Sequence, residues 1–155
     1  MFQIVPLPAE DFAQLFALSE DELAARHIVS EIVTKKPGTP CRVSLQYAEP
    51  GERVLLLNHQ HQPAQTPYQA SHAICVREGV TAADLAPGEL ADVFKVPVVL
   101  SVRAFDNTGM LRAAELVEGP SSAAVFDGLL EREDVAYLQV HFAKYGCFAA
   151  HVERV

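Results

Sequence analysis

The C-terminal segment carries the clearest alternation of apolar and polar residues in the chain. Residues 137–152 are predicted to form two antiparallel strands around a loop that contains Gly146. Burial of both apolar sets against one core would pair Phe142 with Phe148. The core face would then carry Leu138, Val140, Phe142, Phe148, Ala150 and Val152. The opposite face would carry Tyr137, Gln139, His141, Ala149, His151 and Glu153. In this register Cys147 lies diagonally beside His141, within side-chain reach.

Two earlier hairpins are predicted from the same kind of pattern. Residues 41–47 alternate, and Pro50-Gly51 provides a turn into a second strand over residues 53–61. The inward positions of the first strand would be Cys41, Val43, Leu45 and Tyr47, and the outward ones Arg42, Ser44 and Gln46. Residues 98–106 form the most apolar segment and should be an interior strand of the sheet. The turn at residues 107–109 joins this strand to a partner over residues 110–117.

Helical signals lie near the start of the chain and before its last hairpin. Apolar residues at helical spacing predict a helix over residues 12–16. Ser19 and Glu22 form a capping-box pattern for a second short helix. A third helix should be capped by Ser121 or Ser122 and bury one apolar stripe. Further strands are predicted over residues 2–5, 28–33 and 72–77.

This order of elements indicates the α+β class. A doubly wound fold would need helices that alternate regularly with strands, whereas here hairpins follow one another directly. At 155 residues the chain fits a single domain, residues 1–155, which can bury roughly two-thirds of its unfolded surface. The expected architecture is one domain with a largely antiparallel sheet built from hairpins and with helices packed on it.

The charge balance and the N-terminus exclude several classes of partner. The chain has 12 Lys and Arg against 20 Asp and Glu, a formal net charge of −8. No basic run occurs, so nucleic acid is not expected as a partner, because binding to phosphate backbones requires clustered Lys and Arg. The N-terminus lacks the regions of a signal peptide, and no apolar run approaches the roughly 20 residues of a membrane helix. The three unclustered cysteines favour reduced thiols. We therefore expect a cytoplasmic protein without membrane contact.

His59-Gln60-His61 has the spacing of metal ligands on a strand. Imidazoles at positions i and i+2 lie on the same face, as in β-scaffold metal sites. The cupin family follows such a pair with a glutamate a few residues later, whereas this chain continues Gln-Pro-Ala-Gln-Thr-Pro-Tyr. The spacing selects no third ligand from the other candidates: His72, Cys75, His141 and His151. Solvent-facing histidines are the favoured interpretation, and neither a metal nor a cofactor is predicted.

Cys147 and His141 are candidate catalytic residues, as a nucleophile and its base. A reactive thiolate needs a nearby imidazole or cation and an exposed position, and a loop tip would expose Cys147 more than Cys41 or Cys75. No Asp or Asn that could orient His141 is identifiable. The alternative is an inert buried cysteine, which is a common use of this residue.

Arginines within strands are candidate ligands for an anion. Arg42, Arg77 and Arg103 could each hold a carboxylate or phosphate in a bidentate contact. The alternative is a structural ion pair, which for Arg103 would be a diagonal contact with Glu115. Tyr68, in a loop that contains two prolines, could stack on a ligand or cover the core.

Several dispersed segments together carry a family resemblance: Pro40–Leu45, Leu55–Asn58, Gln62-Pro63, Pro67-Tyr68, His72–Glu78, Arg103–Asp106, and His141 with Gly146-Cys147. They resemble, in this order, a family of short bacterial proteins catalogued as domain of unknown function 1203. The resemblance spans nearly the whole chain and implies a stand-alone domain with no assigned activity. The residues matched to its motifs form a shared site candidate: Cys41, Arg42, Tyr68, Arg103, His141 and Cys147. The family's final motif tends to have asparagine after the histidine, where this chain has Phe142.

Two hypotheses about function remain open at this point. The first is a binding or catalytic pocket for a small anionic molecule, in which Arg42, Tyr68 and Arg103 contact the ligand and His141 and Cys147 supply the chemistry. The second is an interaction module without turnover, in which hairpin edges pair between subunits of a homodimer. Convergence of the arginines, His141 and Cys147 on one pocket would favour the first hypothesis.

Overall fold

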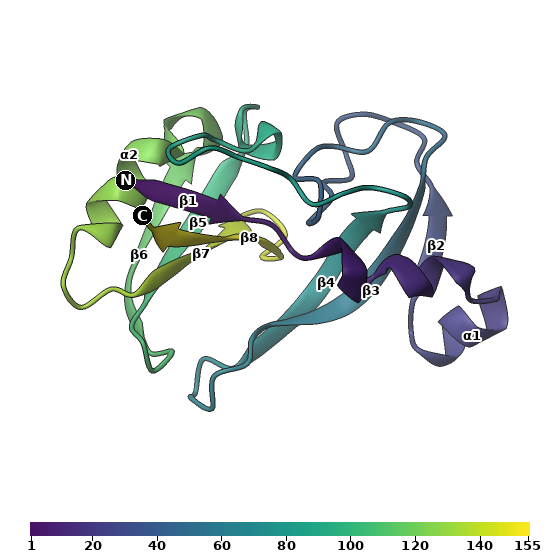
Figure 1. The fold of residues 1–155 in the computed structure, drawn as a ribbon, viewed down its shortest axis with the longest axis horizontal. Helices are drawn as coiled ribbons and strands as arrows, with labels where there is room; N and C mark the ends of the chain where they lie inside the picture. The colour runs from purple at the N-terminus through teal and green to yellow at the C-terminus, as the bar shows by residue number, and fades with distance from the viewer.

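The computed structural model describes residues 1–155 and contains two antiparallel sheets, which lie side by side in Figure 1. The larger sheet has five strands in the spatial order β1 (Phe2–Val5), β8 (Phe148–Arg154), β7 (Tyr137–Phe142), β5 (Val99–Phe105) and β6 (Leu111–Glu118). The smaller sheet has the order β2 (Val29–Ile32), β3 (Arg53–Gln62) and β4 (Ala70–Arg77). Antiparallel hairpins with separate helices confirm the α+β class.

The helices are short. The two α-helices are α1 (Glu20–Ala25) and α2 (Ser122–Leu130), and four 3₁₀ turns are η1 (Ala9–Asp11), η2 (Ala13–Ala17), η3 (Asp92–Phe94) and η4 (Gly119–Ser121). The capping box predicted for α1 is present, because Ser19 Oγ accepts from the Glu22 N–H at 3.2 Å and Glu22 Oε2 accepts from the Ser19 N–H at 2.7 Å. The helix predicted over residues 12–16 forms η2 instead, which has no side-chain cap. None of these helices has the length and apolar character needed to cross a bilayer.

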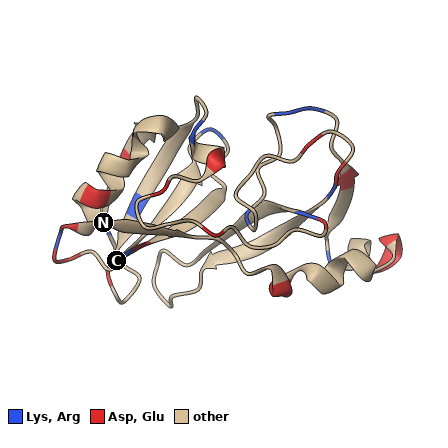
Figure 2. Ribbon diagram, turned by 45° about the horizontal axis from the view of Figure 1, so that its top comes forward, with Lys and Arg blue, Asp and Glu red and all other residues tan.

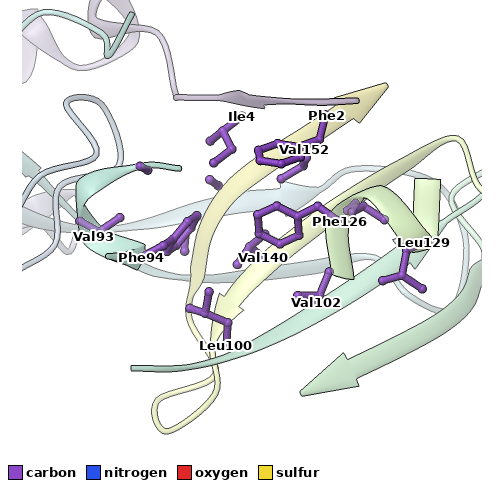
Figure 3. Close-up of a cluster of buried hydrophobic side chains, with 14 of the residues drawn as sticks. Phe2, Ile4, Val93, Phe94, Leu100, Val102, Phe126, Leu129, Val140 and Val152 are labelled. Atoms are coloured by element: carbon purple, nitrogen blue, oxygen red, sulfur yellow. The ribbon is translucent and has the colours of Figure 1, made fainter. Parts of the chain in front are cut away.

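The main core lies between α2 and one face of the larger sheet (Figure 3). The Phe126 ring on α2 packs edge-on against Phe2 on β1, with centroids 5.2 Å apart. The N-cap position of α2 is Ser121, one of the two residues predicted to cap this helix, but its side chain makes no capping hydrogen bond. β5 lies between β7 and β6, and its residues Val102 and Ala104 are fully buried. The prediction of an interior strand at residues 98–106 is confirmed.

A second core lies on one face of the smaller sheet. It contains Leu23 from α1, Leu55 from β3 and Ile74 from β4, all almost fully buried. The segment of residues 40–48 joins this core to the main one, because Val43 packs in the second core and Leu45 in the first. The two sheets are therefore held together by apolar contacts at both ends of this segment.

Residues 41–47 do not form the predicted strand. The segment turns back on itself, with the Cys41 N–H donating to the Gln46 carbonyl at 3.0 Å and Leu45 at a φ of 51°. The strand that precedes β3 in the smaller sheet is β2, in which Ser30 pairs with Leu55. Arg42, predicted to face outward, is buried with 3% exposure. Alternation alone could not show this fold-back, because burial against two different cores produces the same apolar pattern as one strand face.

The final hairpin keeps the predicted register only as far as Val140. This residue pairs with Ala150, as the alternation requires. His141 then pairs with Phe148, so Ala149 is an extra residue in β8 and forms a β-bulge. The predicted pair between Phe142 and Phe148 is therefore wrong.

The bulge reverses the faces of the residues that precede it in β8. Phe148 leaves the predicted core face and stacks on the His61 ring, with centroids 5.4 Å apart. Cys147 joins the main core instead of the histidine face. An inserted residue moves the side chains that precede it to the opposite face of the sheet. The alternation of apolar and polar residues does not reveal the insertion.

Lys and Arg are scattered over loops and strands and form no continuous patch (Figure 2). Some of them form ion pairs with near neighbours in sequence on the surface, such as Lys95 with Asp92 at 2.8 Å and Arg132 with Asp134 at 2.8 Å. The arginines that lack a carboxylate partner are therefore the more informative ones.

Candidate functional site

The polar face of the larger sheet meets the end of the β3–β4 hairpin, and five of the six histidines gather there. They come from both sheets: His59, His61, His72, His141 and His151. The rings of His61 and His141 lie 4.8 Å apart, although they belong to different sheets. We define the inter-sheet site as these two histidines together with Gln139 and with Arg103, which lies opposite Gln139 in the pairing of β5 with β7.

His59 and His61 face the larger sheet rather than solvent. Both are half-buried, and their rings pack against Phe148 at 6.0 and 5.4 Å. The interpretation as solvent-facing histidines is wrong, because a tertiary contact covers this end of β3. No three or more His, Cys, Asp or Glu side chains are arranged to hold a metal ion. Burial lowers the pKa of His59, so its imidazole is neutral at physiological pH.

Gln139 on β7 is the centre of the inter-sheet site. Its Nε2 donates to the His61 carbonyl at 2.8 Å, and its Oε1 lies 2.8 Å from His61 Nδ1. Since an oxygen at this position can only accept, His61 Nδ1 carries the proton and Nε2 has a free lone pair. Burial lowers the pKa of His61, and the positive charge of Arg103 lowers it further. Gln139 was placed on this face by the alternation, but nothing in the sequence indicated its role.

His141 is fully buried and neutral. Its Nδ1 lies 3.0 Å from the Gly146 carbonyl, to which it donates, and its Nε2 lies 3.3 Å from Gln139 Oε1. Burial, followed by the charge of Arg103, lowers the pKa of His141 to about 3, and the Gly146 carbonyl acts in the opposite direction. Both ring nitrogens thus face oxygen acceptors. A protonated His141 would therefore have a hydrogen-bond acceptor for each of its two N–H groups.

Arg103 on β5 is half-buried and has almost no partners in the protein. Its Nε donates weakly to Ser101 Oγ at 3.4 Å, and neither terminal nitrogen has a hydrogen bond. The predicted ion pair with Glu115 does not form, because a bulge in the β5–β6 pairing sets Arg103 opposite Ala114 and puts Glu115 on the other face. Burial lowers the pKa of Arg103 with no carboxylate to oppose it. The guanidinium is therefore open to an acceptor from solution.

Arg42 and Cys147 form a separate pair that does not include His141. Arg42 Nη2 donates to Cys147 Sγ at 3.1 Å, and its Nε donates to the Phe148 carbonyl at 2.7 Å. Cys147 is buried with 9% exposure, more than Cys41 at 1% but less than the half-buried Cys75, so the predicted greater accessibility of Cys147 holds against Cys41 and is wrong against Cys75. The structure therefore does not bring the predicted arginines, His141 and Cys147 together in one pocket.

The remaining candidates lie outside both groups. The Tyr68 ring packs edge-on against Phe105 at 6.3 Å and thus covers one end of the sheet. Arg77 forms two hydrogen bonds with Glu52, at 2.9 and 2.6 Å, which is the structural ion pair expected as its alternative role.

A polar cavity of about 470 Å³ opens beside the inter-sheet site. His61 and Gln139 form part of its wall together with Tyr137, His151 and the turn at residues 107–109. The Thr66 hydroxyl, in the loop between β3 and β4, donates to the Gly109 carbonyl at 3.1 Å and holds this turn against the loop. The cavity gives small polar molecules access to His61 and Gln139.

Comparison with known proteins identifies one family. The family model described as "Protein of unknown function (DUF1203)" matches residues 38–154, which include every candidate site residue. No curated protein and no solved structure matches the chain.

Proposed function

Because the chain belongs to the DUF1203 family of proteins of unknown function, whose description assigns no activity, we propose a function from the geometry: the inter-sheet site binds a small anion. The observation that carries the proposal is Arg103. Its terminal nitrogens have no acceptor in the protein, although the side chain is half-buried and lies beside two neutral histidines. A guanidinium in this state favours a bidentate carboxylate or phosphate ligand.

The neighbours of Arg103 suit an oxyanion. Ser101 lies two residues away on the same face and has a hydroxyl that can donate to a ligand oxygen. His61 Nε2 has a free lone pair, so it can accept a proton from a ligand that carries one. Two hydrogen bonds with Gln139 fix the position of His61, which supplies part of the preorganisation that a binding site needs. We therefore propose a small carboxylate or phosphate as the ligand class.

The proposal is tested by calorimetric titration with inorganic phosphate, sulfate and succinate. Wild-type protein should bind at least one of them saturably, and Arg103→Gln should weaken that binding by about tenfold or more. Arg112→Gln is the matched control, because Arg112 lies on the same hairpin but already pairs with Asp106. Equal affinity in the Arg103→Gln variant, or no binding of any of these anions by the wild type, would overturn the proposal.

Self-association through a sheet edge is the second candidate function. β6 is an edge strand whose Leu116 is 70% exposed, and Ile32 on the edge strand β2 is 60% exposed. Exposed apolar residues on unpaired edges favour pairing with a second chain, which would give a homodimer. Light scattering of the purified protein at several concentrations distinguishes a dimer from a monomer.

We also propose the cytoplasm as the compartment of this protein. All three cysteines are free thiols, which supports this proposal.

A further inference from the structure

A second cavity, of about 330 Å³, lies beside the turn of the final hairpin, and we call it the hairpin-turn cavity. Its wall combines the larger sheet with the segment that links β2 to β3, and in Figure 1 the yellow turn between β7 and β8 lies between the two sheets. The volume falls within the range of roughly 300–1,000 Å³ that is typical of small-molecule sites. The cavity is separate from the polar one at the inter-sheet site, because the two share no lining residue.

The lining of the hairpin-turn cavity is rigid and mostly apolar. Tyr47, Phe142 and Tyr145 contribute aromatic side chains, and three prolines lie in the same wall. Aromatic and proline side chains lose little conformational freedom when a ligand packs on them. Their flat surfaces also suit the offset and edge-on contacts that aromatic rings prefer. The lining therefore favours a ligand with an aromatic ring.

Charge around this cavity has one sign, although the chain as a whole has a net charge of −8. No Asp or Glu lines the cavity. In contrast, all four lysines of the chain belong to the lining or lie within two residues of it: Lys35, Lys36, Lys95 and Lys144. A cleft with charges of one sign attracts ligands of the opposite sign. An anionic ligand is therefore favoured.

Two of these lysines have no partner in the protein. Lys36 and Lys95 each form an ion pair with a surface carboxylate, whereas Lys35 and Lys144 form none. The stem of Lys35 lies against the cavity wall, because a Cβ placed at Gly38 would come 3.7 Å from the Lys35 Cγ. Lys144 is part of the wall, and its Nζ lies 5.6 Å from the centroid of an aromatic ring in the lining. Both ammonium groups are thus available to a ligand at the rim.

A buried cation adds to the positive potential from behind the wall. Arg42 forms no ion pair with Asp or Glu, and its hydrogen bonds go to two backbone carbonyls and to Cys147 Sγ. Its guanidinium also lies over the Phe142 ring, 5.3 Å from the centroid, and both Cys147 and Phe142 line the cavity. Carbonyl groups satisfy the N–H donors but do not neutralise the charge. The field of Arg42 therefore favours an anion in the cavity.

We propose that the hairpin-turn cavity binds a small aromatic carboxylate. The ring packs among the aromatic residues and prolines of the wall, and the carboxylate pairs with Lys35 and Lys144 at the rim. Tyr47 is half-buried in the wall, and its hydroxyl, which has no hydrogen-bond partner in the protein, can donate to the ligand. An apolar wall with a few polar groups that fix orientation is the usual design of a small-molecule site. The proposal does not depend on the anion site at Arg103.

The test is calorimetric titration with 2-naphthoate at an ionic strength of about 0.15 M, which screens distant charges. Two related compounds separate the contributions, because 2-naphthamide has the ring without the charge and acetate has the charge without the ring. Wild-type protein should bind 2-naphthoate saturably, and both 2-naphthamide and acetate should bind at least about fivefold more weakly. No binding of 2-naphthoate, or equal affinity for either related compound, would overturn the proposal.

Two double variants test the lysines with the same change of charge. Lys35→Gln combined with Lys144→Gln removes the two unpaired ammonium groups and should weaken binding of 2-naphthoate by about fivefold. Lys36→Gln combined with Lys95→Gln removes the two that already have carboxylate partners and should weaken it by less than about twofold. Equal losses in the two double variants would show that net charge, rather than contact at the rim, explains the binding, and would overturn the proposal.

A matched pair of variants tests the cavity itself. Val99→Trp fills part of the cavity at a position that is 43% exposed, and Val29→Trp makes the same change at a 48% exposed position on β2, outside the cavity. Val99→Trp should weaken binding of 2-naphthoate by about tenfold, and Val29→Trp should leave it unchanged. Wild-type affinity in Val99→Trp would overturn the proposal.

Arg103→Gln distinguishes this site from the inter-sheet site. Because Arg103 does not line the hairpin-turn cavity, the variant should bind 2-naphthoate with wild-type affinity while it loses affinity for the small anions proposed above. Loss of 2-naphthoate binding in Arg103→Gln would assign the aromatic carboxylate to the inter-sheet site and overturn the present proposal.

Discussion

Arg42 and Arg103 are two guanidiniums without a carboxylate partner, placed on opposite sides of the hairpin formed by β7 and β8. Burial lowers the pKa of both. Arg42 has acceptors on three of its nitrogens, all supplied by the protein. Arg103 has one weak contact, with Ser101. The comparison shows that burial alone does not define a binding site: a guanidinium satisfied by the fold holds the fold together, and an unsatisfied one is available to a ligand.

The difference comes from the backbone around each side chain. Arg42 lies in a segment that turns between the two cores, so backbone carbonyls of Pro40 and Phe148 point toward it. Arg103 lies in a regular interior strand, whose carbonyls are used by the neighbouring strands. Regular strands have no spare acceptors for a side chain, and this leaves Arg103 unsatisfied.

The largest expected effect is a difference in the free energy of unfolding between variants of the two arginines. Arg42→Met should lower the free energy of unfolding by about 3 kcal/mol, because it removes the donor from the buried Phe148 carbonyl, the part-buried Pro40 carbonyl and the Cys147 sulfur. Arg103→Met should change it by less than about 0.5 kcal/mol. Urea denaturation followed by circular dichroism measures both. Equal losses in the two variants would remove the distinction between a structural and an open arginine.

The next effect concerns pH. The pKa of His141, about 3, is lowered from its ordinary value of 6.5, so between these values the unfolded chain binds more protons than the folded one. The free energy of unfolding should therefore fall as the pH falls through this window, by up to about 1.4 kcal/mol per pH unit from one histidine. His141→Gln should flatten the slope, and Arg42→Met should leave it in place. Denaturation curves at several pH values provide the test, and an unchanged slope in His141→Gln would contradict it.

A smaller effect is expected from coupling between anion binding and protonation of the neighbouring histidines. A bound anion compensates the charge of Arg103, which now lowers the pKa of His61 and His141, so binding should raise both pKa values. Affinity for sulfate, which does not titrate in this range, should increase as the pH is lowered from about 7.5 to about 6. Calorimetry in buffers with different ionisation enthalpies reports the proton uptake directly. Affinity that is independent of pH, without proton uptake, would show that the histidines do not sense the ligand.

The smallest effect is expected at the edge strand beside Arg103. Leu116 lies opposite Ser101 and is exposed, so Leu116→Lys adds a positive charge near Arg103 without disturbing the core. Anion affinity should rise by about twofold at low salt and return to the wild-type value at high salt. Light scattering on the same samples should show no change of mass. Dissociation of a dimer in this variant would favour the second candidate function instead.

Local patterns predicted the elements that depend on neighbouring residues. The capping box of α1, the interior position of β5 and the pairing of Val140 with Ala150 all follow from short-range spacing and apolar content. These features are predictable because backbone geometry links residues a few positions apart. The same alternation also placed His141 and Gln139 on one polar face, and they share it in the structure.

The sequence by itself determined the α+β class, the hairpins of the larger sheet and the polar face that carries His141. The tertiary structure decided the rest of the candidate sites, because they depend on contacts between distant segments and on two bulges. The bulge at Ala149 moved Cys147 away from the histidine face and toward Arg42. The contact between the sheets brought His61 to Gln139. An inserted residue and a contact between remote segments leave no periodic signal in a sequence, so only the folded chain shows which polar groups meet.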